Sequence, residues 1–143
     1  MVIDTTLALK DALTLSKDYT VVINSLWTLY PAALAAVLTA LNAKSWKPQP
    51  ELLAGAFAIF AAANAYTLYT AFETKRAAVK YAGTLVSPQS DLGKLVNAMM
   101  PPDSLGMVIF HVVLDLAVIT VIFLIARHAR RAHAQNSSPI LAE

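Results

Sequence analysis

The stretch "GMVIFHVVLDLAVITVIFLIARHARR", Gly106 to Arg131, decides the fold class. Nearly every residue over 107–126 is apolar, and a helix needs about 20 such residues to cross the hydrocarbon core of a bilayer. A basic cluster that begins at Arg127 follows the run directly, as at the end of a transmembrane helix. The stretch therefore predicts a transmembrane helix over 107–126.

The composition of the whole chain agrees with a membrane protein. Of the 143 residues, 57% are hydrophobic and 14% are charged, against about 45–50% and about 25% in an ordinary soluble domain. The absence of cysteine excludes disulfides and thiolate metal sites. The net charge of +2 comes from lysines and arginines at segment ends, with no basic patch among aromatic residues, so we expect contact with lipid headgroups and none with nucleic acid.

A first span is predicted over about 19–43, where the apolar residues suffice to cross a bilayer. Pro31 lies inside it and is expected to kink or break the helix, because proline removes one backbone hydrogen bond. Residues 4–18 mix apolar and charged positions. They predict an amphipathic helix that lies on the membrane or a polar extension of the first span, beginning near Asp4.

A second span is predicted over about 52–72, after Pro48 and Pro50, with helical character that continues to Gly83. Ala54, Ala58 and Ala62 recur every four residues, a spacing of small side chains that lets helices approach closely in lipid. We expect this alanine face to pack against another helix.

The remaining segments complete an all-α membrane protein with a single helical domain over 1–143. Residues 89–100 show helical amphipathic spacing and predict a short interfacial helix, which Pro101 and Pro102 end before the third span. The tail over 132–143 carries few structure signals and is expected to be mobile. Three spans place the two termini on opposite sides of the membrane, which the sequence does not identify.

His111 and Asp115 interrupt the most apolar segment of the chain. Asp115 is near the middle of the third span, and His111 lies one turn earlier on the same helical face. An ionised carboxylate at this depth costs at least about 2.5 kcal/mol, so Asp115 must be neutral, paired or exposed to a wet cavity. Side chains of the other two spans could form a polar seam with it. The candidates are Asn24, Trp27, Asn64, Tyr66 and Tyr69.

Several interpretations of this pair stay open. His111 and Asp115 could join helices by hydrogen bonding, which is the common role of polar residues in membrane helices. They could carry protons, or act as a catalytic acid–base pair on a lipophilic substrate that enters from the bilayer. Metal or haem ligation by His111 has the least support, because one histidine and one carboxylate form an incomplete ligand set. We therefore predict no metal site and assign no cofactor. Trp27 and Tyr30 are expected mainly to fill space around Pro31.

The architecture resembles known small membrane proteins. Three spans in a chain of this length are similar to the membrane anchor subunits of succinate dehydrogenase and fumarate reductase, although the haem-binding members use a histidine in the second span and this second span has none. The tail sequence "RRAHAQN", 130–136, resembles a basic motif of small glutathione-linked membrane enzymes, in which further helices follow. Phage holins likewise have up to three spans and a basic tail.

These observations favour an accessory or anchoring subunit of a membrane complex. Three helices cannot readily surround a carboxylate in the middle of the membrane, so we expect a homo-oligomer or other membrane subunits as partners. One alternative is a membrane-embedded enzyme, with Asp115 and His111 as its acid–base pair in a pocket against Asn64 and Tyr66. The other is a holin-like pore or proton path in which Asp115 from several subunits lines one axis. Whether the chain is an enzyme is left open.

Overall fold

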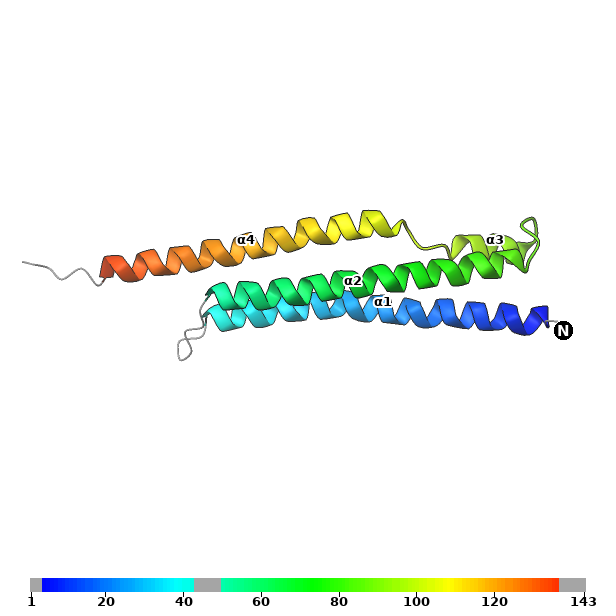
Figure 1. Cartoon of the computed structure of the whole chain (residues 1–143), viewed down its shortest axis with the longest axis horizontal. Helices are drawn as coiled ribbons and strands as arrows, with labels where there is room; N and C mark the ends of the chain where they lie inside the picture. Colours follow the sequence, from blue (N-terminus) through cyan, green and yellow to red (C-terminus); the bar gives the residue numbers. More distant parts are fainter. Residues whose placement is uncertain (1–3, 43–49, 137–143) are drawn as a thin grey trace, which may run out of the picture.

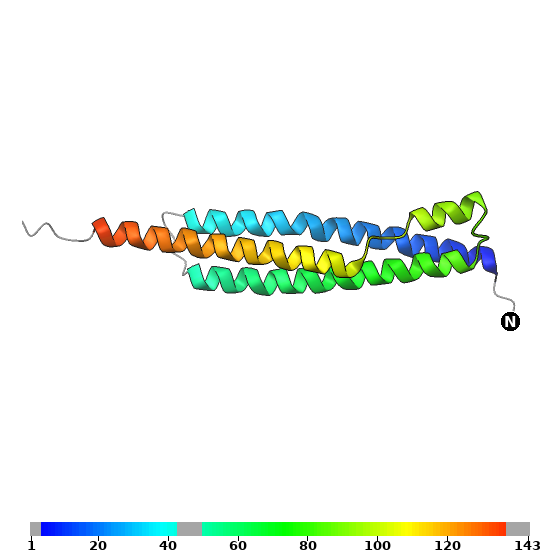
Figure 2. The ribbon, with the colours of Figure 1, turned by 90° about the horizontal axis from the view of Figure 1, so that it is seen from above.

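The computed structural model describes residues 4–42 and 50–136, which form four helices. They are α1 (Thr5–Asn42), α2 (Pro50–Thr84), α3 (Asp91–Ala98) and α4 (Ser104–Asn136). Figures 1 and 2 show α1, α2 and α4 side by side along one axis, with α3 beside one end of the bundle. Thr5–Asn42, Glu51–Thr84 and Ser104–Ile125 are each long and apolar enough to cross a membrane. The prediction of an all-helical chain with three potential spans is therefore confirmed.

Helix α1 joins the predicted amphipathic segment and the first span in one continuous helix. The Asp4 carboxylate caps it, because its Oδ1 accepts the backbone N–H groups of Thr6 at 3.0 Å and Leu7 at 3.4 Å. Residues 5–18 are thus an extension of the span, and the alternative of a separate surface helix is wrong. The helix also runs unbroken through Pro31. Packing against α2 on both sides of the proline holds the two halves in line.

Helix α2 is central, since α1, α3 and α4 all pack against it. Its buried residues follow the alternating three- and four-residue spacing of a coiled coil: Ala54, Phe57, Ala61, Asn64, Leu68 and Ala71. Of the predicted alanine face, Ala54 is buried but Ala62 is exposed. A spacing of four residues drifts around a helix with 3.6 residues per turn, so the packing face follows the heptad instead.

Beyond the apolar segments, residues 5–18, residues 73–84 and α3 form a small unit that we call the head (Figure 1, right). Its core contains Ala12 of α1, Val79 and Ala82 of α2, and Val96 of α3. The Ser90 hydroxyl caps α3 by accepting the Gly93 N–H at 3.0 Å. The short helix predicted within 89–100 is present, and it packs lengthwise against the end of α2.

A polar corner fixes the start of α4 against α2. The Arg76 guanidinium donates to the Pro102 carbonyl at 2.7 Å and lies 3.4 Å from Glu73 and 3.6 Å from Asp103. Ser104 donates a short hydrogen bond to Glu73. These charged groups mark one end of the apolar segments, so the head lies outside them.

The apolar segments have matching lengths between their polar ends. At 1.5 Å per residue, the stretches over 19–42, 51–73 and 104–127 are each roughly 33–35 Å long, close to the thickness of a bilayer core of about 30 Å. Helix α4 continues to Asn136, so 132–136 of the predicted mobile tail are helical. The rest of that tail and the segment over 43–49 lie outside the described residues.

Candidate functional site

Three helices meet at one buried hydrogen-bonded chain of polar side chains. His111 Nδ1 lies 3.2 Å from Asp115 Oδ2, one turn along α4. From α1, the Tyr30 hydroxyl donates to Asp115 Oδ1 at 2.7 Å. From α2, the Asn64 amide nitrogen lies 3.2 Å from His111 Nε2. Asp115 and His111 therefore link all three long helices, and we call these four residues the polar chain.

One arrangement of protons satisfies every contact in the polar chain. An ionised Asp115 accepts one hydrogen bond from Tyr30 and one from the Nδ1–H of a neutral His111. The unprotonated Nε2 of that tautomer then accepts a hydrogen bond from the Asn64 amide. Each carboxylate oxygen and each ring nitrogen has a partner, which is what a buried polar group requires to avoid a desolvation penalty.

Aromatic rings enclose the polar chain. Trp27 stacks on the His111 ring with centroids 5.5 Å apart, and Tyr30 meets that ring edge-on at 5.0 Å. Phe57 of α2 packs edge-on against Tyr30. His111 is 1% exposed and Asp115 is 9% exposed. The expectation that three helices cannot readily surround this carboxylate is thus wrong, because bulky rings on α1 and α2 fill the space that alanine-rich helices would leave.

The polar chain lies halfway along the apolar segments. Tyr30 and Asp115 are each eleven residues from the head-side ends at Tyr19 and Ser104, and Asn64 is nine residues from Glu73. At 1.5 Å per residue these separations are roughly 14–17 Å, about half the thickness of a bilayer core. In a membrane the site would be at the depth where an unpaired charge costs most.

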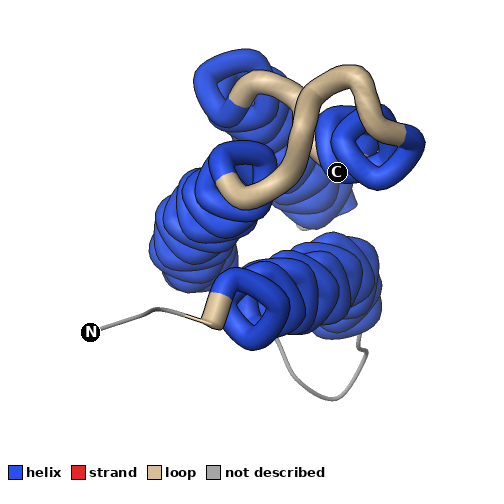
Figure 3. The backbone as a smooth tube through the Cα atoms, turned by 90° about the vertical axis from the view of Figure 1, so that its right-hand side faces the viewer, coloured by secondary structure: helices blue, strands red, loops and turns tan. Residues whose placement is uncertain are grey.

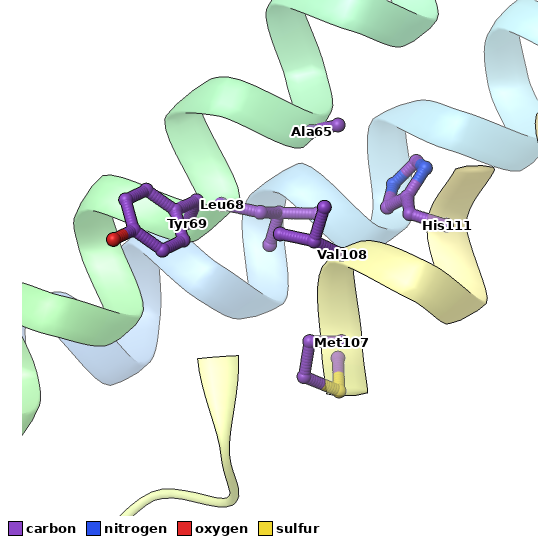
Figure 4. A pocket seen from close by; sticks show the side chains of 6 residues that line it. All are labelled: Ala65, Leu68, Tyr69, Met107, Val108 and His111. Atoms are coloured by element: carbon purple, nitrogen blue, oxygen red, sulfur yellow. The ribbon is translucent and has the colours of Figure 1, made fainter. Parts of the chain in front are cut away.

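A small cavity adjoins His111 on the side that faces the head. Its volume is about 10 Å³, room for about one water molecule. Ala65, Leu68 and Tyr69 of α2 line it together with Met107, Val108 and His111 of α4 (Figure 4). The cavity therefore has no room for a lipophilic substrate, and its lining is almost wholly apolar.

Comparison of the chain with protein-family models, curated proteins and solved structures gives no match.

The predicted site residues divide into those at the polar chain and those away from it. Asn64 and Trp27 contact His111 directly, and Tyr69 lines the neighbouring cavity. Tyr66 is 71% exposed and Asn24 is also exposed, so neither joins the seam. Of the two residues expected to form a pocket against Asp115 and His111, Asn64 lies beside His111 and Tyr66 does not.

Tyr30 was expected mainly to fill space around Pro31, yet it donates the shortest hydrogen bond of the polar chain. Its spacing carried the signal, because Ile23, Tyr30 and Val37 recur every seven residues and all three are buried or partly buried. A tyrosine on that stripe, in the middle of a span, is placed to meet a polar residue of another helix.

The described residues also bear on metal binding and on pores. Within 4–42 and 50–136, no group of three or more histidine, aspartate or glutamate side chains could hold a metal ion. Asp115 points to Tyr30 inside the bundle. In this arrangement it does not face outward to line an axis shared by several subunits.

Proposed function

We propose that the chain is an integral membrane protein that serves as an accessory or anchoring subunit of a larger membrane complex. The observation that carries this proposal is the apolar surface of the head. Leu7, Leu15, Leu92 and Leu95 are between 42% and 60% exposed there, although the head lies beyond the charged ends of the membrane-length segments. Lipid would cover the exposed leucines of the membrane-length segments, whereas those of the head would leave water by contact with a protein partner.

The polar chain supports the same proposal. Its four side chains satisfy one another, and the cavity beside them has room for about one water. A closed hydrogen-bonded chain that links three helices is suited to hold a small bundle in one conformation. The bundle then presents the head in a fixed geometry to the rest of the complex.

The test is the native mass of the full chain purified from its own membranes in mild detergent. We expect a heteromeric particle with a stoichiometric partner. Leu95→Glu should release the partner, because Leu95 is 60% exposed and contributes to the apolar surface without being needed for the fold of the head. Asn97→Glu, which adds the same charge at an exposed position of α3, is the matched control and should retain the partner. A particle that contains only this chain would refute the proposal.

A further inference from the structure

The head contains an open groove between α1 and α3. Six residues of α1 between Thr6 and Lys17 line it, and Leu92 of α3 forms the opposite wall. The groove is shallow and largely open, with a volume of about 450 Å³. In the view of Figure 2 α3 is on the same side of the head as α1, and Figure 3 shows the same end of the molecule along its axis.

The groove has a preformed apolar floor. Leu9 and Leu13 lie one helical turn apart on α1 and pack against the head core around Ala12, Val79 and Val96. Because they are held from behind by this core, they need little rearrangement to receive a ligand. Their outer surfaces are partly exposed to the groove.

The rim of the groove is cationic. Lys10 and Lys17 lie two turns apart on one face of α1, and both are exposed. Among the described residues neither lysine forms an ion pair, whereas Lys94 of α3 is paired with Asp91 and Arg76 with Glu73. The groove thus combines a leucine floor with two lysines that have no internal counter-charge.

We propose that this groove binds an amphipathic helix of a partner subunit that carries acidic side chains beside its apolar face. The apolar residues of that helix contact Leu9, Leu13 and Leu92, and its Asp or Glu residues pair with Lys10 and Lys17. From Thr6 to Lys17 the groove follows about 17 Å of α1, the length of about three turns of helix. A helix laid in an apolar groove is a recurrent mode of recognition. This inference rests on the proposed accessory-subunit function.

The position of the groove favours a protein over a lipid. Lys17 lies next to the start of the apolar segment at Tyr19, and the groove extends from there away from the segment, toward the N-terminus. An anionic phospholipid would have to withdraw its acyl chains from the bilayer to occupy it, at a cost of about 0.8 kcal/mol per CH₂ group. A helix of a partner reaches the groove without that cost.

The experiment is photo-crosslinking of the full chain in its own membranes. A photoreactive amino acid replaces Thr14, which lines the groove and is exposed. After irradiation, mass spectrometry maps the crosslinked peptide. We expect one partner protein, joined at a segment whose apolar residues recur at three- and four-residue spacing with Asp or Glu alongside. The same amino acid at Tyr81, an exposed head position outside the groove lining, should not crosslink to that segment.

Charge reversal tests the recognition chemistry. Lys10→Glu with Lys17→Glu replaces two attractions by two repulsions and should lower the crosslink yield about tenfold. Lys80→Glu, at an exposed head position outside the groove lining, should leave the yield unchanged. Circular dichroism of each purified variant establishes that the helices are intact.

The outcomes separate this inference from the function on which it rests. A crosslink to lipid, to a second copy of this chain or to no molecule would overturn the groove proposal, as would a yield that the lysine reversals leave unchanged. If a stoichiometric partner copurifies and Leu95→Glu releases it while Thr14 does not reach it, the accessory-subunit function stands and the groove is wrong. If no partner copurifies, both proposals fall.

Discussion

Replacement of Tyr30 by phenylalanine tests whether the polar chain stabilises the bundle. The substitution removes one hydroxyl and leaves Asp115 Oδ1 without its donor, while the ring that packs on His111 and Phe57 remains. A hydrogen bond to a charged group contributes about 1.5–3 kcal/mol in soluble proteins, whereas interhelical hydrogen bonds in a membrane average about 0.6 and reach about 1.7 kcal/mol. Because this bond is buried and its acceptor is a carboxylate, we expect a loss of about 1.5 kcal/mol in the free energy of unfolding.

The assay is reversible unfolding in mixed micelles by titration with a denaturing detergent, followed by circular dichroism. Tyr66→Phe is the matched control, because Tyr66 is 71% exposed and lies away from the polar chain. It should change the free energy of unfolding by less than about 0.5 kcal/mol. A double-mutant cycle with Asp115→Leu isolates the contact, since Tyr30→Phe should cost nothing once the carboxylate is gone.

Two results would refute the reasoning. If Tyr30→Phe costs the same in the wild-type and Asp115→Leu backgrounds, the hydroxyl does not act through Asp115. If Tyr30→Phe and Tyr66→Phe have equal effects, the polar chain contributes nothing measurable, and the role of Asp115 would have to lie outside the stability of the bundle.

Two further predictions concern the head and its junction with α4. In the same unfolding assay, Gly93→Ala should destabilise the protein by about 1–3 kcal/mol, because the new Cβ would overlap the Ser87 carbonyl oxygen. Gly55→Ala is the control: no heavy atom lies within 4 Å of its new Cβ, so it should be neutral or stabilising by up to about 1 kcal/mol. Arg76→Gln should lower local stability at the start of α4 by about 1 kcal/mol through loss of its contacts with Pro102 and Glu73, seen as faster amide hydrogen exchange over 104–108. The exposed Lys80→Gln serves as control, and equal exchange in the two variants would contradict a structural role for Arg76.

The three membrane-length helices could be predicted from the sequence because hydropathy is a local property. Each apolar segment has the length that a bilayer requires, and its ends are marked by charges or prolines within the chain itself. The sequence did not decide whether residues 4–18 form a separate surface helix or extend the first span, and the reason is physical. Nothing local distinguishes a helix that turns onto a surface from one that continues, and the packing of Ala12 against Val79 and Ala82 decides it.

The membership of the polar chain depends on the rotational phase of each helix. At about 100° per residue, Asn64 and Tyr66 are about 200° apart and cannot face the same neighbour, and Asn24 is about 120° away from Tyr30. Hydropathy ranks all four as polar or aromatic residues within a span, so it cannot choose among them. Which of these residues enter the interior of the bundle depends on the face along which the helices pack.

That face is present in the sequence as a heptad spacing on all three helices. Asn64 lies on the stripe of Phe57, Ala61 and Leu68, and His111 and Asp115 lie on the stripe that continues through Val118 and Ile122. A polar residue on such a stripe enters the interior of the bundle, whereas one that falls off it faces outward. Once the stripe of α1 is followed in the same way, it passes through Ile23 and Tyr30. The donor to Asp115 can then be identified as the tyrosine that shares both its depth and its phase, which explains why Asn24 and Tyr66 stay outside.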